Sequence, residues 1–203
     1  MGGWTQHNGQ AIALPLANVD TDQLIPARFM SVPRADGYGN FLLHDLRRDA
    51  QGTLRSDLPL NAHSGASVLV AGRNFGSGSS REAAVYALVD AGFHAVIAPS
   101  FGDIFASNAV NNGLLPARIE DAACEALLAQ LGAGMLPVTV DLHASTIAIN
   151  GTILTFALEE SWRIKLINGW DDIDLTQQYT PDISRYKDNR SQTASWAWPA
   201  AAD

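Results

Sequence analysis

The sequence predicts a layered α/β domain built on a mixed β-sheet, and three features lead to that fold class. In the middle of the chain, short apolar runs alternate with segments whose apolar residues recur at helical spacing. Further on, residues 138–149 alternate between apolar and polar, and Asn150-Gly151 is a hairpin signal before residues 153–156. Apolar residues make up 47% of the 203 residues and charged residues 17%, which suits a folded core.

Each expected element has its own signal. Strands are expected at short apolar runs, several of which are followed by turn residues. Helices are expected where apolar residues share one face and where Gly92, Gly113 or Gly169 can end the last turn. The expected strands are residues 12–16, 67–71, 94–99 and 114–119, and the expected helices are residues 81–91, 103–112, 121–131 and 159–168.

Two segments fall outside this alternation. Residues 30–65 are rich in Gly, Pro, Asp and Arg, and a connection of this length without periodicity indicates a functional loop. The tail from residue 181 is polar and carries Trp196 and Trp198. Such tails are often loosely ordered, and the alternative is that the two tryptophans dock on a partner. We therefore expect one domain over residues 1–180 and a C-terminal tail over residues 181–203.

Composition excludes several classes of function. The 13 basic and 21 acidic residues give a formal net charge of −8, which argues against nonspecific nucleic-acid binding. No apolar run reaches the roughly 20 residues that span a bilayer, and no secretory signal is visible, so the default location is cytoplasmic. The one cysteine, Cys124, cannot form an internal disulfide. Since iron–sulfur clusters take about four thiolates, it cannot hold such a cluster alone, and the histidines show no metal spacing.

The most informative segment is the turn Gly72-Arg-Asn-Phe-Gly-Ser-Gly-Ser-Ser-Arg-Glu82, between an expected strand and an expected helix. Its glycines allow close approach of a ligand to the backbone, and the helix start supplies unpaired N–H groups. Arg81 offers a planar guanidinium suited to a carboxylate, and a deprotonated hydroxyl of Ser79 or Ser80 would be stabilised there. The turn lacks the patterns of a dinucleotide fingerprint, a P-loop or a nucleophile elbow. The alternative interpretation is a helix that Ser79 or Ser80 merely caps.

Several blocks of sequence recur, in the same order, in one known family. Asn74-Phe-Gly-Ser-Gly-Ser-Ser-Arg-Glu82 resembles the N-F/Y-G-x-G-S-S-R-E motif of the aconitase superfamily. Asn18-Val-Asp-Thr-Asp-Gln-Leu-Ile-Pro26 resembles the N-x-D-T-D-x-I-I-P signature of the small subunits of 3-isopropylmalate dehydratase. Further family blocks match residues 98–105, 111–116 and 168–176, so the resemblance covers about residues 8–180.

This resemblance implies a fold and a reaction. The fold is the aconitase-type swivelling domain, three layers in the order β/β/α with a mixed sheet. The reaction is that of a hydro-lyase in leucine biosynthesis, which interconverts 2-isopropylmalate and 3-isopropylmalate by removing and re-adding water. In this family the chain pairs with a large subunit that carries a [4Fe-4S] cluster. The implied partners are therefore that subunit and a small di-acid, with no nucleic acid and no membrane; self-association of the isolated chain is left open.

The resemblance also implies residue roles by position. Ser79 matches the serine that removes the proton α to a carboxylate, and Asp22 matches an acidic residue near the leaving hydroxyl. Arg81 matches an arginine that binds the substrate carboxylate, and Ser80 matches a neighbouring substrate-contacting serine. Further candidates for substrate binding are Arg28, with a solvated arginine as the alternative, and Arg34 in the 30–65 loop, which helps to choose the substrate in this family.

Two positions depart from the family motif. Ser77 stands where the isopropylmalate enzymes usually have Cys, and Ala83 stands where His follows Arg-Glu in most relatives. Because neither replaces Ser79 or Arg81, we expect the chemistry to survive. The near alternative is a paralogous subunit for citraconate or methylmalate, dimethylmaleate or homoaconitate. The alternative of another class is a non-catalytic domain that only binds an anion at the Ser-rich turn.

Overall fold

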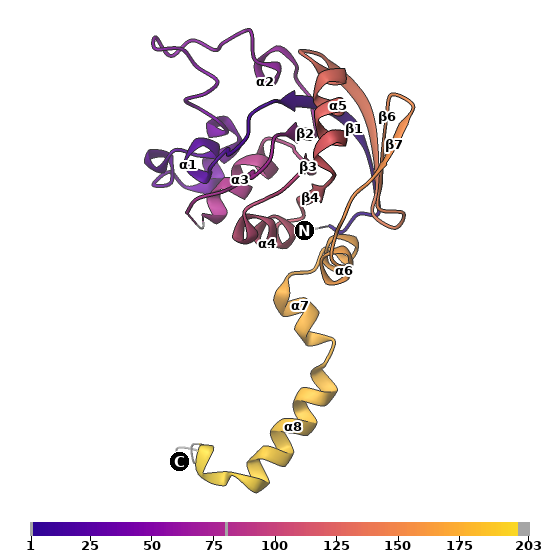
Figure 1. Cartoon of the computed structure of the whole chain (residues 1–203). Helices are drawn as coiled ribbons and strands as arrows, with labels where there is room; N and C mark the ends of the chain where they lie inside the picture. Colours follow the sequence, from indigo (N-terminus) through magenta and orange to yellow (C-terminus); the bar gives the residue numbers. More distant parts are fainter. Residues whose placement is uncertain (1, 80, 199–203) are drawn as a thin grey trace. The chain divides into compact units, whose positions relative to one another are not determined.

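A computed structural model describes residues 2–79 and 81–198. The chain forms two compact units, one ending at Trp170 and the other beginning at Asp171. The first unit is built on a seven-stranded sheet with the order β4-β3-β2-β1-β5-β6-β7 (Figure 1). The strands are β1 (Gln6–Leu14), β2 (Val68–Ala71), β3 (Ala95–Ala98), β4 (Leu115–Arg118), β5 (Met135–Asp141), β6 (Thr146–Ile149) and β7 (Thr152–Thr155).

The sheet is mixed, as predicted. Strands β1 to β4 are parallel neighbours, whereas β5, β6 and β7 continue the sheet in antiparallel fashion from the other side of β1. The helices of the first unit are α1 (Thr21–Leu24), α2 (Pro59–Ala62), α3 (Glu82–Asp90), α4 (Asp103–Asn111), α5 (Asp121–Leu131) and α6 (Glu160–Asn168), with 3-10 turns at Ala27–Phe29, Arg34–Asp36 and Tyr38–Phe41. This confirms the predicted α/β class.

Two apolar layers lie on opposite faces of the parallel strands. Successive strand residues point to opposite faces, so Ile12 and Leu69 pack with α3, while Ala11 and Val68 pack with α5 and α6. The second layer also contains Val138 of β5 and residues of β6, because the sheet curls over this face (Figure 1). The antiparallel strands, the parallel strands and α3 thus form the β/β/α arrangement.

The antiparallel half departs from the expected elements in one place. Residues 138–149 are not one alternating stretch, because a turn over residues 142–145 separates β5 from β6. The Ala144 N–H donates to Asp141 Oδ1 at 2.8 Å, and Ser145 has a φ of 52°. The turn contains neither Gly nor Pro. A carboxylate and a left-handed serine close it instead, so its sequence carries no strong turn signal.

The connection between β1 and β2 is long but ordered. Besides its short helices, it is fixed by the buried Tyr38, whose hydroxyl donates to the Val32 carbonyl at 3.0 Å. Arg34 joins it to α3 by an ion pair with Asp90. We call residues 15–67, between β1 and β2, the excursion.

The second unit contains α7 (Asp172–Gln177), α8 (Thr180–Thr193) and a 3-10 turn over Ser195–Ala197. The described part of the tail is therefore mostly helical. Trp196 is 83% exposed, and the Arg190 guanidinium lies 6.0 Å from its ring centroid.

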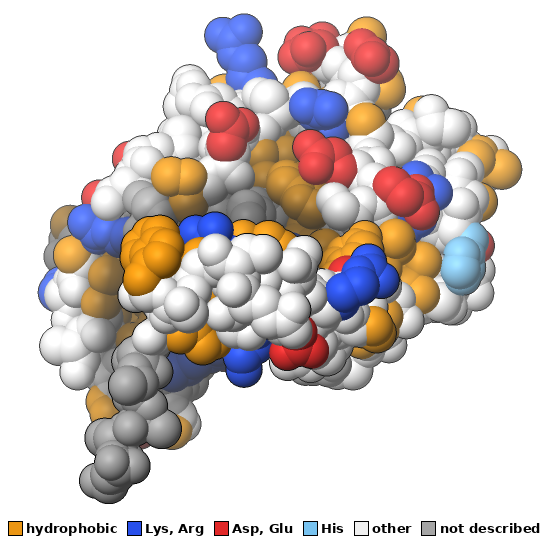
Figure 2. Space-filling view, turned by 90° about the horizontal axis from the view of Figure 1, so that it is seen from below, with side chains coloured by type: hydrophobic (Ala, Val, Ile, Leu, Met, Phe, Trp, Pro, Cys, Tyr) orange, Lys and Arg blue, Asp and Glu red, His pale blue; other side chains and the backbone are white. Residues whose placement is uncertain are grey.

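Among the described residues, no helix is both long and apolar enough to cross a bilayer. On the face drawn in Figure 2, Lys and Arg side chains are interspersed with Asp and Glu and do not gather into one basic surface.

Candidate active site

Three loops that follow neighbouring parallel strands meet at the carboxyl edge of the sheet. A bridge between Asp20 and Ser77 joins the loop after β1 to the loop after β2. A second bridge, between Phe75 and Phe101, joins the loop after β2 to the loop after β3. In open α/β sheets, ligands bind at this edge. The Ser-rich turn therefore lies where a ligand site is expected, held between two other loops.

Hydrogen bonds to the loop after β1 fix the backbone from Gly76 to Ser79. Thr21, which is 2% exposed, donates its N–H to Ser77 O at 3.0 Å and its hydroxyl to Ser79 O at 2.8 Å. The Gly76 N–H donates to Val19 O at 2.7 Å. Ser79 itself is exposed. In the described part of the turn, the hydrogen-bonded backbone thus presents the exposed Ser79 hydroxyl to its surroundings, which is what preorganised catalysis needs.

Glycine is required where the turn packs against α4. Gly76 has a φ of 71°, and a Cβ atom built there would lie 2.1 Å from Cγ of Phe105. A Cβ atom on Gly102 would lie 2.6 Å from the Gly76 carbonyl oxygen. Only glycine accommodates both the left-handed backbone and this close approach.

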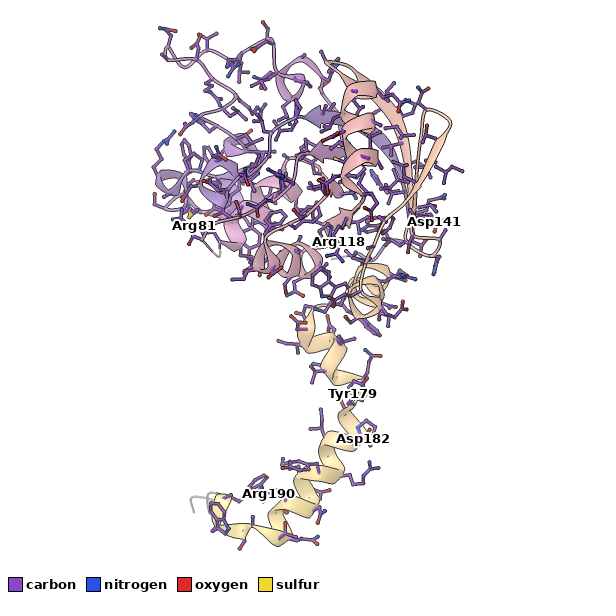
Figure 3. The ribbon with its side chains drawn as sticks, in the orientation of Figure 1. Arg81, Arg118, Asp141, Tyr179, Asp182 and Arg190 are labelled. Atoms are coloured by element: carbon purple, nitrogen blue, oxygen red, sulfur yellow. The ribbon has the colours of Figure 1, made fainter. Side chains whose placement is uncertain are left out.

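Arg81 and Asp22 form an ion pair beside the turn. Asp22 lies in the first turn of α1, where Asp20 and Gln23 form a capping box. Arg81 occupies the N-cap position of α3, where no side chain caps the helix. Ser79 is therefore not the cap, and Ser80, the other residue named in that interpretation, lies outside the described residues. The Arg81 and Asp22 side chains are 27% and 54% exposed, so both are open to exchange with a ligand. Figure 3 shows Arg81 close to α1 and α3.

A shallow cavity of about 180 Å³ opens at this point. Its lining includes Ser79 and Arg81 from the turn, Thr21 from α1, and Asp103 and Phe105 from α4. Sites that enclose a whole ligand usually measure about 300–1,000 Å³. The cavity is smaller than that, so by itself it does not enclose a whole ligand.

The two remaining arginine candidates are ion-paired within the chain. Arg28 Nη1 donates to Asp45 Oδ2 at 2.9 Å, and this contact lowers the pKa of Asp45 to about 2. Arg34 donates to both carboxylate oxygens of Asp90, at 3.1 and 2.8 Å. Its guanidinium carbon also lies 3.8 Å from the Tyr86 ring centroid. Neither arginine lines the cavity beside Ser79.

The structure thus brings three of the six predicted site residues to one place. These three are Asp22, Ser79 and Arg81. Arg28 and Arg34 lie in the excursion and away from this cavity. Ser80 lies outside the residues that the structure describes.

The sequence analysis missed the role of Thr21. It lies within the Asn18–Pro26 block, so the block pointed to its position, but not to the hydrogen bonds that position Ser79. The two departures from the family motif do not disturb this frame. Ser77 contributes its backbone to the bridge with Asp20, and Ala83 packs partly buried against the apolar layer under α3.

The residues of this chain do not fit an iron–sulfur cluster. Cys124 is 1% exposed, and its Sγ donates to the Ala71 carbonyl at 3.2 Å. Burial raises the pKa of the Cys124 thiol to about 11, which disfavours the thiolate that a metal needs. Within residues 2–79 and 81–198, no group of three His, Cys, Asp or Glu side chains is placed to hold a metal ion.

Comparison with known proteins defines the class and then the family. The family model of the aconitase C-terminal domain matches residues 1–122. The 3-isopropylmalate dehydratase small subunit of Shouchella clausii is 42% identical over 187 residues, which cover 91% of this chain and 95% of that protein. The Shewanella amazonensis small subunit is 43% identical over 202 residues, covering 97% and 99%. A solved 3-isopropylmalate dehydratase from Methanocaldococcus jannaschii superposes with a TM-score of 0.64 at 27% identity, covering 89% of this chain and 99% of that chain.

The fold is that of an aconitase-type C-terminal domain. Within that class, the chain belongs to the family of 3-isopropylmalate dehydratase small subunits.

Proposed function

We propose that this chain is the small subunit of a cytoplasmic hydro-lyase that interconverts 2-isopropylmalate and 3-isopropylmalate in leucine biosynthesis. The observation that carries the proposal is the exposed Ser79, whose flanking backbone is fixed by Thr21 and which lines one cavity with Arg81. Family membership supports the substrate, since the relatives carry this name.

In the proposed reaction, Ser79 is the base. Its oxygen removes the proton on the carbon next to a carboxylate, and the hydroxyl on the neighbouring carbon leaves as water. Negative charge then builds up on the substrate carboxylate, and the Arg81 guanidinium stabilises it. The same positive charge favours the deprotonated form of the serine. Re-addition of water at the other carbon completes the isomerisation.

Asp22 and Arg81 change partners in this proposal. The substrate carboxylate replaces Asp22 on Arg81, since a guanidinium pairs with either carboxylate and can bind one through two hydrogen bonds. Asp22 is then free to exchange a proton near the leaving hydroxyl. Ser80 is proposed to contact the substrate. Arg28 and Arg34 could contact it only by giving up Asp45 and Asp90, so their contribution is tested separately below.

The large subunit and its [4Fe-4S] cluster are part of the proposal. The name of the relatives implies a larger partner. The small cavity supports this, because a second protein surface is needed to enclose a di-acid. The single buried Cys124 supports placing the cluster on that partner.

The experiment is anaerobic co-expression of this chain with the large subunit from the same organism, followed by turnover assays on 2-isopropylmalate and citraconate. Ser79→Ala is expected to abolish turnover while leaving the complex assembled. Ser161→Ala, at an exposed serine in α6 outside the turn and the excursion, is the matched control and is expected to retain full activity.

Each outcome decides one part of the proposal. Full turnover by Ser79→Ala would contradict its role as the base. Turnover of citraconate alone would keep the mechanism and replace the substrate. A wild-type complex that binds di-acids but turns over neither substrate would favour the non-catalytic alternative. For Arg28→Gln and Arg34→Gln, a raised KM with unchanged kcat would indicate substrate contact.

A further inference from the structure

The arginines of the excursion fall into two groups. Three of them are matched to a carboxylate: Arg28 to Asp45, Arg34 to Asp90 and Arg55 to Asp57. The other two, Arg47 and Arg48, have no carboxylate partner among the described residues. The excursion as a whole carries six Asp and five Arg, but its two arginines without a carboxylate partner are consecutive in the chain.

These two arginines line one cavity. Its volume is about 740 Å³, within the range of about 300–1,000 Å³ that is common for small-molecule sites. Most of the lining comes from residues 37–66 of the excursion, and the remainder includes Ala91 and Phe93, just after α3. Asn40, Asn61 and Ser64 add uncharged hydrogen-bonding side chains.

The cavity is distinct from the candidate active site. Arg81 precedes α3, whereas Asp90 ends it, and nine helical residues separate the two sites by about 13 Å. The two cavities share no lining residue. The active-site cavity lies at the carboxyl edge of the parallel strands, while this cavity lies near their opposite edge, where Ala66 and Phe93 precede β2 and β3.

Arg47 is held in place by neutral groups. Its Nε donates to Asn61 Oδ1 at 2.7 Å, and its Nη1 donates to Leu42 O at 3.4 Å. Asn61 cannot turn away, because its own amide donates to Arg47 O at 2.8 Å and to Arg55 O at 2.9 Å. Burial, and then the neighbouring Arg48, lower the pKa of Arg47, so the folded chain places two like charges together at a cost. An anion would offset that cost.

Asp90 also lines the cavity, but it does not neutralise this pair. Both of its carboxylate oxygens accept hydrogen bonds from Arg34. The cavity therefore keeps a net positive character although the whole chain carries a formal charge of −8.

We propose that the cavity between residues 37–66 and the C-terminal end of α3 binds a small oxyanion, a carboxylate or a phosphate, through Arg47 and Arg48. The guanidinium groups supply charge-assisted hydrogen bonds, and the Asn40 amide and the Ser64 hydroxyl orient the ligand. This site is separate from the one that the proposed function requires.

The test is titration of the full-length chain, labelled with nitrogen-15, with inorganic phosphate and separately with succinate at constant ionic strength. We expect saturable shifts of the Arg47, Arg48 and Asn61 signals. Arg48→Gln is expected to weaken binding at least tenfold. Arg55→Gln is the matched control, because Arg55 is paired with Asp57 and does not line the cavity. Tighter binding of phosphate than of succinate, or the reverse, identifies the class of oxyanion.

Arg81→Gln separates this site from the active site. Phosphate binding that survives Arg81→Gln and is lost in Arg48→Gln supports the cavity, whatever the turnover assays show. Binding that is lost in Arg81→Gln alone, or no saturation at millimolar phosphate and succinate, overturns it.

If Arg48→Gln does not fold, Arg48→Lys provides the second test. We expect it to bind phosphate more weakly than wild type and to show a smaller rise in Tm with phosphate, because it keeps the charge but not the planar fork. Equal binding by Arg48→Lys and wild type would overturn the role of Arg48.

Discussion

Gly76→Ala tests the close packing that holds the Ser-rich turn. The new Cβ would lie 2.1 Å from Cγ of Phe105, so the ring, which is 4% exposed, would have to move. Phe105 also packs edge-to-face on Phe75 at 5.4 Å and stacks on Phe101 at 6.3 Å. The left-handed backbone costs about 1 kcal/mol for alanine. Overpacking adds about 1–3 kcal/mol. We therefore expect a loss of about 2–4 kcal/mol in the free energy of unfolding.

The matched control is Gly52→Ala. Gly52 has a φ of 81°, close to the 71° of Gly76, but its added Cβ would meet nothing within 4 Å. Only the backbone cost of about 1 kcal/mol should remain. Urea unfolding of the two variants, with unchanged denaturant slopes, measures both losses. Turnover of the assembled enzyme should fall in Gly76→Ala and not in Gly52→Ala, because a displaced Phe105 moves the wall of the cavity that Ser79 lines.

Equal losses in the two variants would refute this reasoning. They would mean that Phe105 moves aside without cost and that the turn is not fixed by its contact with α4. A larger loss of stability in Gly76→Ala than in Gly52→Ala, together with full turnover, would support the packing argument. It would also show that this packing does not affect the activity of Ser79.

Three further predictions follow from ion pairs and burial. In a double-mutant cycle of Arg34→Gln and Asp90→Asn, the coupling free energy measured by urea unfolding should be about 0.5–1 kcal/mol, because the pair is bidentate but partly exposed. Zero coupling would show that the pair does not fix the excursion. Cys124, with a pKa near 11, should resist iodoacetamide in the folded chain and react after unfolding, as mass spectrometry would detect. Rapid labelling of the folded chain would contradict its burial. Burial, and then the stacked His94, lower the pKa of His7 from 6.5, so the unfolded chain binds more protons and stability should fall as the pH drops below about 6.5. The urea midpoint should fall less in His7→Gln than in wild type over that pH range, and an equal fall would contradict the assignment.

The elements with the strongest apolar periodicity were the most predictable. The helix expected over residues 121–131 is α5 (Asp121–Leu131), and the one expected over residues 103–112 is α4 (Asp103–Asn111). Apolar spacing reports which face is buried, and burial decides these elements. Helix α8 was not predicted, because its residues are mostly polar. Local contacts such as the Arg185–Asp182 ion pair leave no apolar pattern.

The sequence motifs identified residues of the candidate site, but they did not show which of these residues contact each other. Family motifs marked Ser79, Arg81 and Asp22, whereas their proximity depends on how three loops meet at the edge of the sheet. Asp22 and Arg81 are 59 positions apart, and nothing local in either segment indicates that they pair. The same is true of Arg34 and Asp90, which are 56 positions apart. A single sequence carries no signal for such pairs, because each is set by tertiary packing.

The position of β1 has a consequence for synthesis of the chain. β1 is made first and lies in the middle of the sheet, yet its residues Gln6–Ile12 pair with Asp141–Met135, across about 120 residues. Closing a loop of that length costs about 4 kcal/mol in chain entropy. A nascent chain that has not reached Met135 therefore exposes an unpaired edge of its central strand, which invites association with other chains. We expect chains halted at residue 130 to aggregate and chains halted at residue 170 to remain dispersed, as sedimentation of stalled ribosome complexes would measure. Equal behaviour of the two would show that β1 is protected before its partner strand is made.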